Sequence, residues 1–216
     1  MRKTLIASAV LSILALAAPA LAGPPFVCHV FEIGSAKSLP WGESRNNWLA
    51  MRDDYDTRTL VADTEKLLTP STPTIVRMET LRRASIYASR DRALAGQLLT
   101  MVMKRMETPG RSVLPDAMAL FDAGYVVEAF NELVWAASFE KQSRGVDRVL
   151  ADLTTPFNAR GLIEKSAMLR PGDAAIEFAL GLLSRAPENE ARFKKAREAA
   201  KQDALLAQNL ARLQLQ

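Results

Sequence analysis

The chain has 216 residues, of which 49% are hydrophobic and 24% charged, with a formal net charge of +4. This composition is typical of one globular domain and excludes a disordered, collagen-like or disulfide-rich chain. The single Cys excludes an intramolecular disulfide, and the single His excludes metal sites and proton relays that need two imidazoles.

Residues 1–22 have the pattern of a secretory signal peptide. Arg2 and Lys3 form a short positive head, residues 5–18 form an apolar run, and Ala20 and Ala22 occupy the two positions that an export peptidase reads. We expect cleavage after Ala22, which would place the mature protein in the periplasm or outside the cell. The alternative is an uncleaved membrane anchor, which the polar residues and the proline within this stretch disfavour.

Removal of this segment changes the charge balance. The segment carries two basic and no acidic residues, so the 28 Lys and Arg of the chain fall to 26, against 24 Asp and Glu. We see no basic stripe with interleaved aromatic residues, and an exported protein meets little nucleic acid, so we expect no nucleic-acid partner. We also expect no transmembrane segment after cleavage.

Residues 23–44 are predicted to be irregular, because Gly and Pro interrupt them, with one short β-like run at 26–33. From there on, apolar residues recur with the 3.6-residue period of amphipathic helices. Two helices are predicted to begin at a Thr cap followed by Pro, at Thr72 and Thr155. The expected helices cover about 60–68, 73–88, 91–107, 115–136, 156–169 and 188–216. A shorter helix is expected within the less regular stretch 140–155, around Val146, Val149 and Leu150, and another follows the turn at 171–173 and includes Ile176 and Leu183.

The predicted fold class is all-α. The segment 115–136 is the most apolar and is expected to be central. Glu79 with Arg82 and Arg83, at i+3 and i+4, is predicted to form a solvated set of ion pairs. Short connections favour antiparallel neighbours, so we expect helix hairpins stacked as a short solenoid or an irregular bundle, in a single domain over 45–216.

Part of the chain resembles the tetratricopeptide repeat, a 34-residue helix hairpin. Ala159 resembles the small residue of its second helix, Pro171 its closing proline, and Leu180 with Gly181 the Leu-Gly pair of the next first helix. The stretch 122–129 is similar to the turn between the two helices.

This resemblance implies repeat-like hairpins at about 115–136 and 156–216. Stacked hairpins leave one concave face exposed, and such faces bind extended peptides or partner helices. The first half of the chain also resembles a secreted bacterial protein of no assigned function, so this resemblance implies no activity. The resemblance therefore implies an interaction module that binds a protein or peptide partner, and the predicted signal peptide would place that partner in the cell envelope.

Cys28 and His29 are the sharpest candidate for chemistry, because the only thiol and the only imidazole are adjacent. Haem attachment of the c type uses Cys-x-x-Cys-His, but Pro25 stands at the position of the first Cys. A reactive or intermolecularly paired thiol is a second alternative. The plainest interpretation is a small apolar Cys that packs the N-terminal segment onto the helices beside a surface His.

Trp41 and Trp48 lie in polar surroundings, where they are either platforms for a partner or anchors of a loop on the bundle. Met103 and Met106 share a helix face, as in copper(I) sites, but core filling is the simpler explanation. Asp56 in an acidic run is predicted to cap a helix rather than to bind a cation.

We find no phosphate loop, nucleophile elbow or His-Glu-x-x-His motif, so no catalytic or metal-ligating residue is predicted. An interaction module without a cofactor is the leading hypothesis. A cofactor or redox protein that uses Cys28 and His29, and a small-molecule or lipid carrier with a cavity along 120–134, are the alternatives.

Overall fold

The computed structural model describes residues 26–42, 47–107, 116–138, 145–150 and 152–213. The predicted signal peptide lies outside these ranges. The helices are η1 (Phe26–Cys28), η2 (Thr57–Thr59), α1 (Leu60–Leu67), α2 (Thr74–Ala88), α3 (Arg92–Glu107), α4 (Ala117–Ala136), α5 (Val146–Leu150), α6 (Ala159–Leu169), α7 (Ala174–Leu183), α8 (Glu188–Ala199), η4 (Ala200–Gln202) and α9 (Ala204–Leu213).

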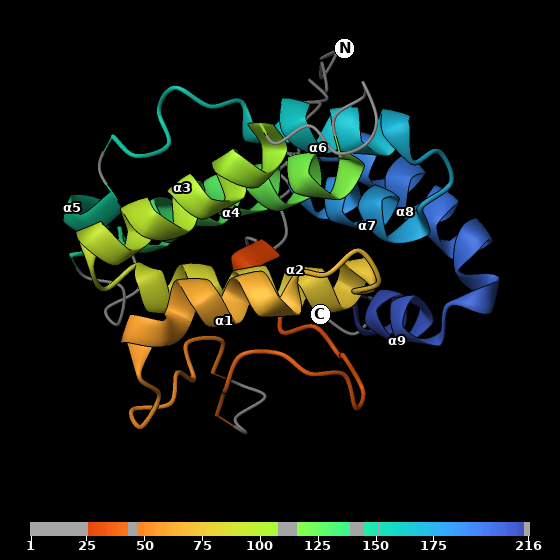
Figure 1. Ribbon diagram of the computed structural model, residues 1–216. Helices are drawn as coiled ribbons and strands as arrows, with labels where there is room; N and C mark the ends of the chain where they lie inside the picture. The colour runs from red at the N-terminus through yellow and green to blue at the C-terminus, as the bar shows by residue number, and fades with distance from the viewer. Residues whose placement is uncertain (1–25, 43–46, 108–115, 139–144, 151, 214–216) are drawn as a thin grey trace, which may run out of the picture.

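The predicted all-α fold with an irregular N-terminal segment is confirmed, because the described residues form helices and no strand. The β-like run at 26–33 begins instead as the 3-10 turn η1 and continues without regular structure. The helices pack as an irregular bundle (Figure 1). Within the described ranges, no helix has the length and apolar character needed to span a membrane.

Helix α4 is the centre of the bundle. It packs against α2, α3, α5, α6 and η1. Its apolar side chains are buried around most of its circumference, with Leu120 at 5% and Val127 and Phe130 at 0% exposure. The side chain of Asp116 accepts from the backbone N–H of Met118 and caps its first turn. The prediction that the most apolar segment is central therefore agrees with the packing.

A close crossing joins α4 to α6. A Cβ atom on Gly124 would lie 2.7 Å from Cγ1 of Ile163 and 2.8 Å from the carbonyl oxygen of Ala159, so only glycine fits there. The turn that we expected within 122–129 does not form, because α4 runs through this stretch as one helix. Gly124 therefore serves helix packing and not a change of chain direction.

Two predicted helix starts lie slightly away from their observed positions. Helix α6 begins at Ala159, where the side chain of Asn158, not Thr155, accepts from a backbone N–H of the first turn. The hydroxyl of Thr72 donates to the carbonyl of Leu67 at 2.7 Å, so it closes the turn after α1 and does not cap α2. Thr and Asn supply similar hydrogen bonds, and the choice between neighbouring caps depends on the local turn.

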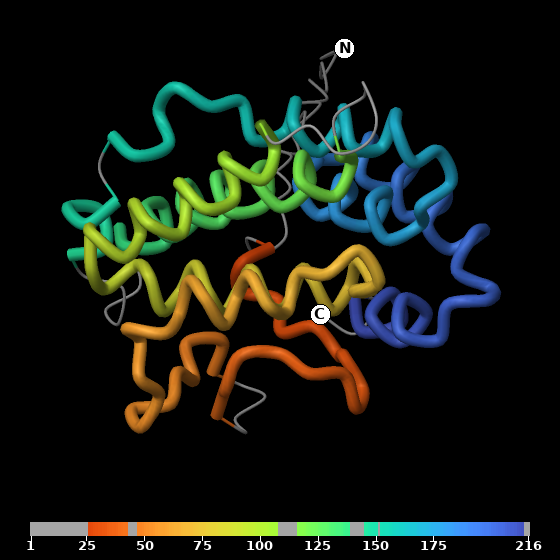
Figure 2. The backbone as a smooth tube through the Cα atoms, in the orientation of Figure 1, coloured from red at the N-terminus to blue at the C-terminus, as the bar shows by residue number. Residues whose placement is uncertain are grey.

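We define the N-terminal arm as residues 26–42. Figure 2 shows it passing from the middle of the bundle, at η1, to the lower surface beneath α1 and α2. Its first turn packs on α4 and α7. Four of its apolar side chains are almost completely buried: Phe26 (2% exposed), Val27 (0%), Phe31 (3%) and Leu39 (1%). The arm is thus an interior part of the bundle, although it forms little regular structure.

Candidate functional site

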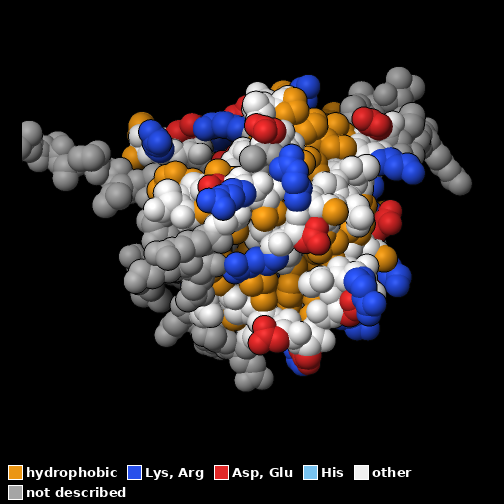
Figure 3. Space-filling model, turned by 90° about the vertical axis from the view of Figure 1, so that its left-hand side faces the viewer, with side chains coloured by type: hydrophobic (Ala, Val, Ile, Leu, Met, Phe, Trp, Pro, Cys, Tyr) orange, Lys and Arg blue, Asp and Glu red, His pale blue; other side chains and the backbone are white. Residues whose placement is uncertain are grey.

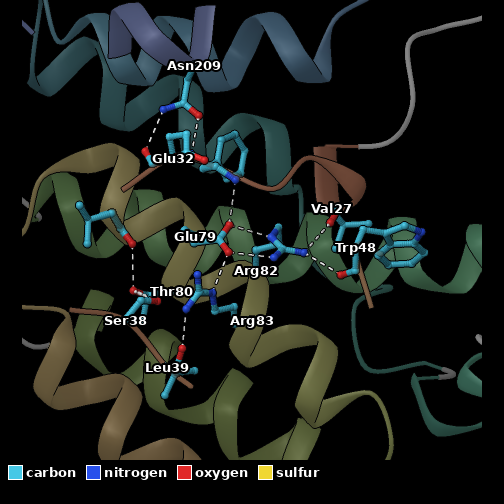
Figure 4. A network of polar contacts seen from close by, with 12 residues as sticks. Val27, Glu32, Ser38, Leu39, Trp48, Glu79, Thr80, Arg82, Arg83 and Asn209 are labelled. Atoms are coloured by element: carbon cyan, nitrogen blue, oxygen red, sulfur yellow. Dashed lines mark hydrogen bonds and ion pairs between the residues drawn. The ribbon is translucent and has the colours of Figure 1, made fainter. Parts of the chain in front are cut away.

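The polar side chains of α2 form a buried network against the arm (Figure 4). Oε2 of Glu79 accepts from Nε of Arg82 at 2.8 Å, and Oε1 accepts from Nε of Arg83 at 2.7 Å. The side chains of Glu79 and Arg82 are 0% exposed and that of Arg83 is 15% exposed. The prediction of a solvated ion-pair set was wrong, because the arm covers this face of α2.

The network binds the backbone of the arm and of the loop that follows it. Glu79 accepts the backbone N–H of Phe31 at 3.1 Å. Arg82 donates to the carbonyl of Trp48 at 2.9 Å, and Arg83 donates to the carbonyl of Leu39 at 2.5 Å. Burial opposes the ionisation of Glu79, but the attraction of its arginines is stronger and lowers the pKa of this carboxyl. The ion pairs thus remain charged while they hold an otherwise irregular segment.

Helix α9 holds the same arm from the opposite side. The side chain of Asn209 accepts the backbone N–H of Glu32 and donates to the backbone carbonyl of Glu32, both at 2.9 Å. Arg212 forms an ion pair with the Glu32 carboxylate at 2.6 Å. Figure 4 shows Asn209 and Glu79 reaching the arm from opposite sides. Recognition of both backbone groups of one residue is typical of the way in which side chains bind extended peptides.

Helix α4 supplies a further carboxylate to the arm. Oε1 of Glu132 accepts the backbone N–H of Phe26 at 3.0 Å, and Oε2 accepts that of Val27 at 2.8 Å. Burial raises the pKa of Glu132 to about 8, although both hydrogen bonds favour the charged form. The ring of Phe26 meets Tyr125 edge to face at 4.5 Å.

The structure places Cys28 and His29 in this arm, beside α7 and α9. They line a small cavity of about 130 Å³ together with Glu32, Phe178 and Asn209 among others. The expectation of a surface His was wrong, because His29 is only 9% exposed. Cys28 packs against the core, as the plainest interpretation had it. Among the described residues, no group of three His, Cys, Asp or Glu side chains is placed to hold a metal ion.

Trp41 packs against side chains of α2. Its ring lies edge to face with Tyr87 at 5.5 Å, and the guanidinium carbon of Arg82 lies 4.9 Å from its ring centroid. Trp48 packs against the core, and its carbonyl accepts from Arg82. Trp41 thus makes the contacts of a side chain that anchors a loop, whereas Trp48 reaches Arg82 through its backbone carbonyl.

A second buried ion pair joins α2 to α4, and the sequence analysis did not predict it. Nη1 of Arg77 lies 2.6 Å from Oδ2 of Asp122, and both side chains are at most 1% exposed. Arg77 also donates to the carbonyl of Thr69 at 2.6 Å. This pair fixes the two central helices to each other.

Several exposed hollows lie on the described surface, and one of them lies between α1 and α3. This α1/α3 groove has a volume of about 650 Å³ and is lined by Val61, Glu65, Ala93, Gly96, Gln97, Thr100, Met101, Lys104 and Arg105. A Cβ atom on Gly96 would meet no other atom within 4 Å, so the space above this residue is empty. The sequence signal was the row of small residues Ala93, Gly96 and Thr100 on one face of α3.

Two further hollows are comparable in volume, one of about 580 Å³ beside α5 and one of about 490 Å³ between α7 and α8. Figure 3 shows the face that carries α5, where hydrophobic side chains form an irregular band among charges of both signs. Three large apolar side chains of the described residues are exposed: Trp135 at 56%, Phe157 at 37% and Met168 at 71%. Single exposed apolar residues are normal on a protein surface.

Comparison with known proteins does not assign this chain to a family. No protein-family model matches the chain, and no curated protein and no solved structure is significantly similar to it. The inferences below therefore depend on the geometry of the chain itself.

Proposed function

We propose that the chain is an exported, non-catalytic interaction module of the cell envelope, which binds a segment of a protein partner in the α1/α3 groove. The observation that carries this proposal is the open space of about 650 Å³ between these helices. Its volume lies in the range of functional binding sites, about 300–1,000 Å³. The predicted signal peptide supports the location, and the tetratricopeptide-like pattern supports a binding role.

The lining of the groove indicates the chemistry of the partner. Val61 and Met101 supply apolar surface, and Ala93 and Gly96 allow a bound segment to approach the α3 backbone closely. The groove carries Lys104, the carboxylate of Glu65 and Arg105, whose guanidinium also donates to the carbonyl of Leu68. We therefore expect a segment with apolar side chains and at least one acidic residue.

The groove is also favoured because the arm fills the inner face of the bundle. The tetratricopeptide-like pattern implied an exposed concave face, but α2, α4, α7 and α9 all contact residues of the arm. The buried side chains of the arm are each worth roughly 1.5–3 kcal/mol, so a partner would not readily displace it. A partner therefore needs a surface outside this region.

A peptide-display experiment tests the proposal. Random peptides are selected on the purified chain 23–216, and the affinities of the enriched peptides are measured by fluorescence anisotropy. Gly96→Trp fills the groove, while Gly96→Ala is the matched control that leaves it open. We expect acidic, partly apolar peptides that bind Gly96→Ala like the wild type and Gly96→Trp at least about tenfold more weakly, and Lys104→Glu should weaken the same peptides.

Equal binding to Gly96→Trp, or a selection that enriches no peptide, would contradict the proposal. No specific observation favours either alternative function, the cofactor or redox protein or the small-molecule or lipid carrier. The apolar side chains of α4 are packed in the core. The space beside Cys28 and His29, about 130 Å³, is below the volume of most ligand sites.

A further inference from the structure

The walls of the α1/α3 groove are two helices, whose backbone groups are largely bonded within each helix. An extended peptide therefore finds no strand edge in this groove with which its own backbone could pair. The N-terminal arm shows what this chain uses to hold an irregular segment, because the side chains of Glu79, Glu132 and Asn209 bind its backbone from three helices. A helix needs no such support, since its backbone hydrogen bonds are internal.

The lining residues of α3 are suited to packing against another helix. Ala93, Gly96 and Thr100 follow one another at spacings of three and four residues, so they lie on one face of α3. The hydroxyl of Thr100 donates to the carbonyl of Gly96 at 2.8 Å, so its hydrogen bond is already made within α3. Short side chains on this face allow a second helix to approach closely, with roughly 8–10 Å between the two axes.

One end of the groove has an excess of cations. Oδ2 of Asp122 lies 2.6 Å from Nη1 of Arg77 and 3.8 Å from Nη2 of Arg105, so one buried carboxylate faces two guanidiniums. Arg105 also donates to the carbonyl of Leu68 at 2.7 Å, which fixes its guanidinium where α1 and α3 end. The side chain of Arg105 is 24% exposed, so a partner can reach it.

Two further charges line the groove. Lys104 is exposed beside Arg105, and Glu65 lies on α1, one turn before the Leu68 carbonyl that Arg105 binds. Three cations, with Arg77 included, thus face two carboxylates at this end. The six other lining residues are uncharged. The groove therefore favours a partner whose acidic side chain lies at one end and whose remaining contact surface is apolar.

We infer that the segment bound in the α1/α3 groove is an α-helix of about three turns, with an acidic side chain at one end that pairs with Arg105 and Lys104; this inference rests on the proposed function. Between Ala93 and Lys104 the axis of α3 is about 16 Å long, and a partner helix of about 11 residues has the same length. Its apolar side chains, repeated every three or four residues, lie over Gly96 and against Met101.

The conformation of a bound peptide tests the inference. The tightest peptide from the display selection is synthesised with ¹³C at its Cα atoms and titrated with the full mature chain. We expect the Cα shifts of the bound peptide to move in the helical direction over about three turns. A proline in the middle of this stretch should weaken binding at least about tenfold, because proline breaks a helix interior.

A double-mutant cycle tests the acidic end. Replacing the acidic residue of the peptide by its amide should weaken binding to the wild type about fivefold to tenfold, and binding to Arg105→Gln less than about twofold. Because Arg105 also binds Leu68, the unfolding free energy of this variant is measured in parallel, and Lys104→Gln gives a second cycle at an exposed position. Lys66→Gln is the matched control, since Lys66 is exposed on α1 outside the groove lining, and it should keep the full effect of the amide.

The outcomes separate this inference from the proposed function. Extended-chain shifts in a peptide that Gly96→Trp weakens would overturn the helix and leave the groove in place as a binding site. An amide effect that is equal in the wild type, Arg105→Gln and Lys104→Gln would overturn the acidic contact. A peptide that binds Gly96→Trp as it binds the wild type would refute the groove itself, and the helix with it.

Discussion

The backbone N–H of Phe31 donates to Oε2 of Glu79 at 3.1 Å and so ties the N-terminal arm to helix α2 across 48 positions of the chain. The same carboxylate is held by two arginines that also bind the arm and its following loop. A residue that would otherwise be a surface ion-pair partner thereby becomes a structural centre of the fold.

Arg82→Met should destabilise the protein by about 3–5 kcal/mol, because it weakens the pairing of a buried Glu79 and leaves the carbonyl of Trp48 without its donor. Urea unfolding followed by circular dichroism measures the change. Arg58→Met is the matched control, since Arg58 pairs with Asp56 at the surface, and it should leave the unfolding midpoint unchanged. Similar losses in both variants would show that burial of the pair contributes nothing.

Glu79→Gln should change the acid side of the stability profile. Because the pKa of Glu79 is lowered in the folded state, its contribution is complete above the unfolded value of about 4.3 and is lost as the pH falls through the folded value. We expect the stability of the wild type to decline below about pH 4.5 and the slope of Glu79→Gln to be shallower there. Unfolding free energies from pH 2.5 to 5 provide the comparison, and equal slopes would exclude this role.

Gly124→Ala should destabilise the protein by about 1–3 kcal/mol, because its Cβ would lie 2.7 Å from Ile163 and force α6 away from α4. Gly96→Ala is the same chemical change in a helix where the new Cβ meets nothing within 4 Å. That variant should gain about 0.5–1 kcal/mol from helix propensity alone. The difference in sign between the two variants, measured by thermal or urea unfolding, is the test; a gain at both positions would refute the close crossing.

Asn209→Asp should cost about 1–3 kcal/mol, because it removes the donor that binds the carbonyls of Glu32 and Leu205 and places a second carboxylate near that of Glu32. Asn209→Ala removes the acceptor for the Glu32 N–H as well, so it should cost at least as much. Urea unfolding ranks the two variants. A variant Asn209→Asp as stable as the wild type would show that α9 does not hold the arm through this side chain.

The sequence predicted the helices well, because the 3.6-residue pattern is a local signal. It did not predict that Glu79 and Arg82 are buried, since i+3 and i+4 spacing is the same for an exposed and a covered ion pair. The covering residues lie about 50 positions earlier, in a segment without a period. The predicted turn at Gly124 was wrong for a related reason, because a glycine is equally typical of a turn and of a close helix crossing.

The candidate groove was predictable only in part. Small residues at 93, 96 and 100 mark one face of α3, but the sequence does not show that α1 forms the opposite wall. Similarly, Cys28 and His29 attracted attention as the sole members of their residue types. Their partners on α7 and α9 are about 150–185 residues away along the chain, which no local pattern reports.

The contact between Glu32 and Asn209 joins positions 177 residues apart. The arm precedes α9 in the chain, so until α9 has been made the apolar side chains of the arm lack one of the two helical surfaces that hold the arm. Closing so long a loop is slow compared with forming the local helix pairs. A segment that is synthesised before most of the helices is thus among the last to reach its native position.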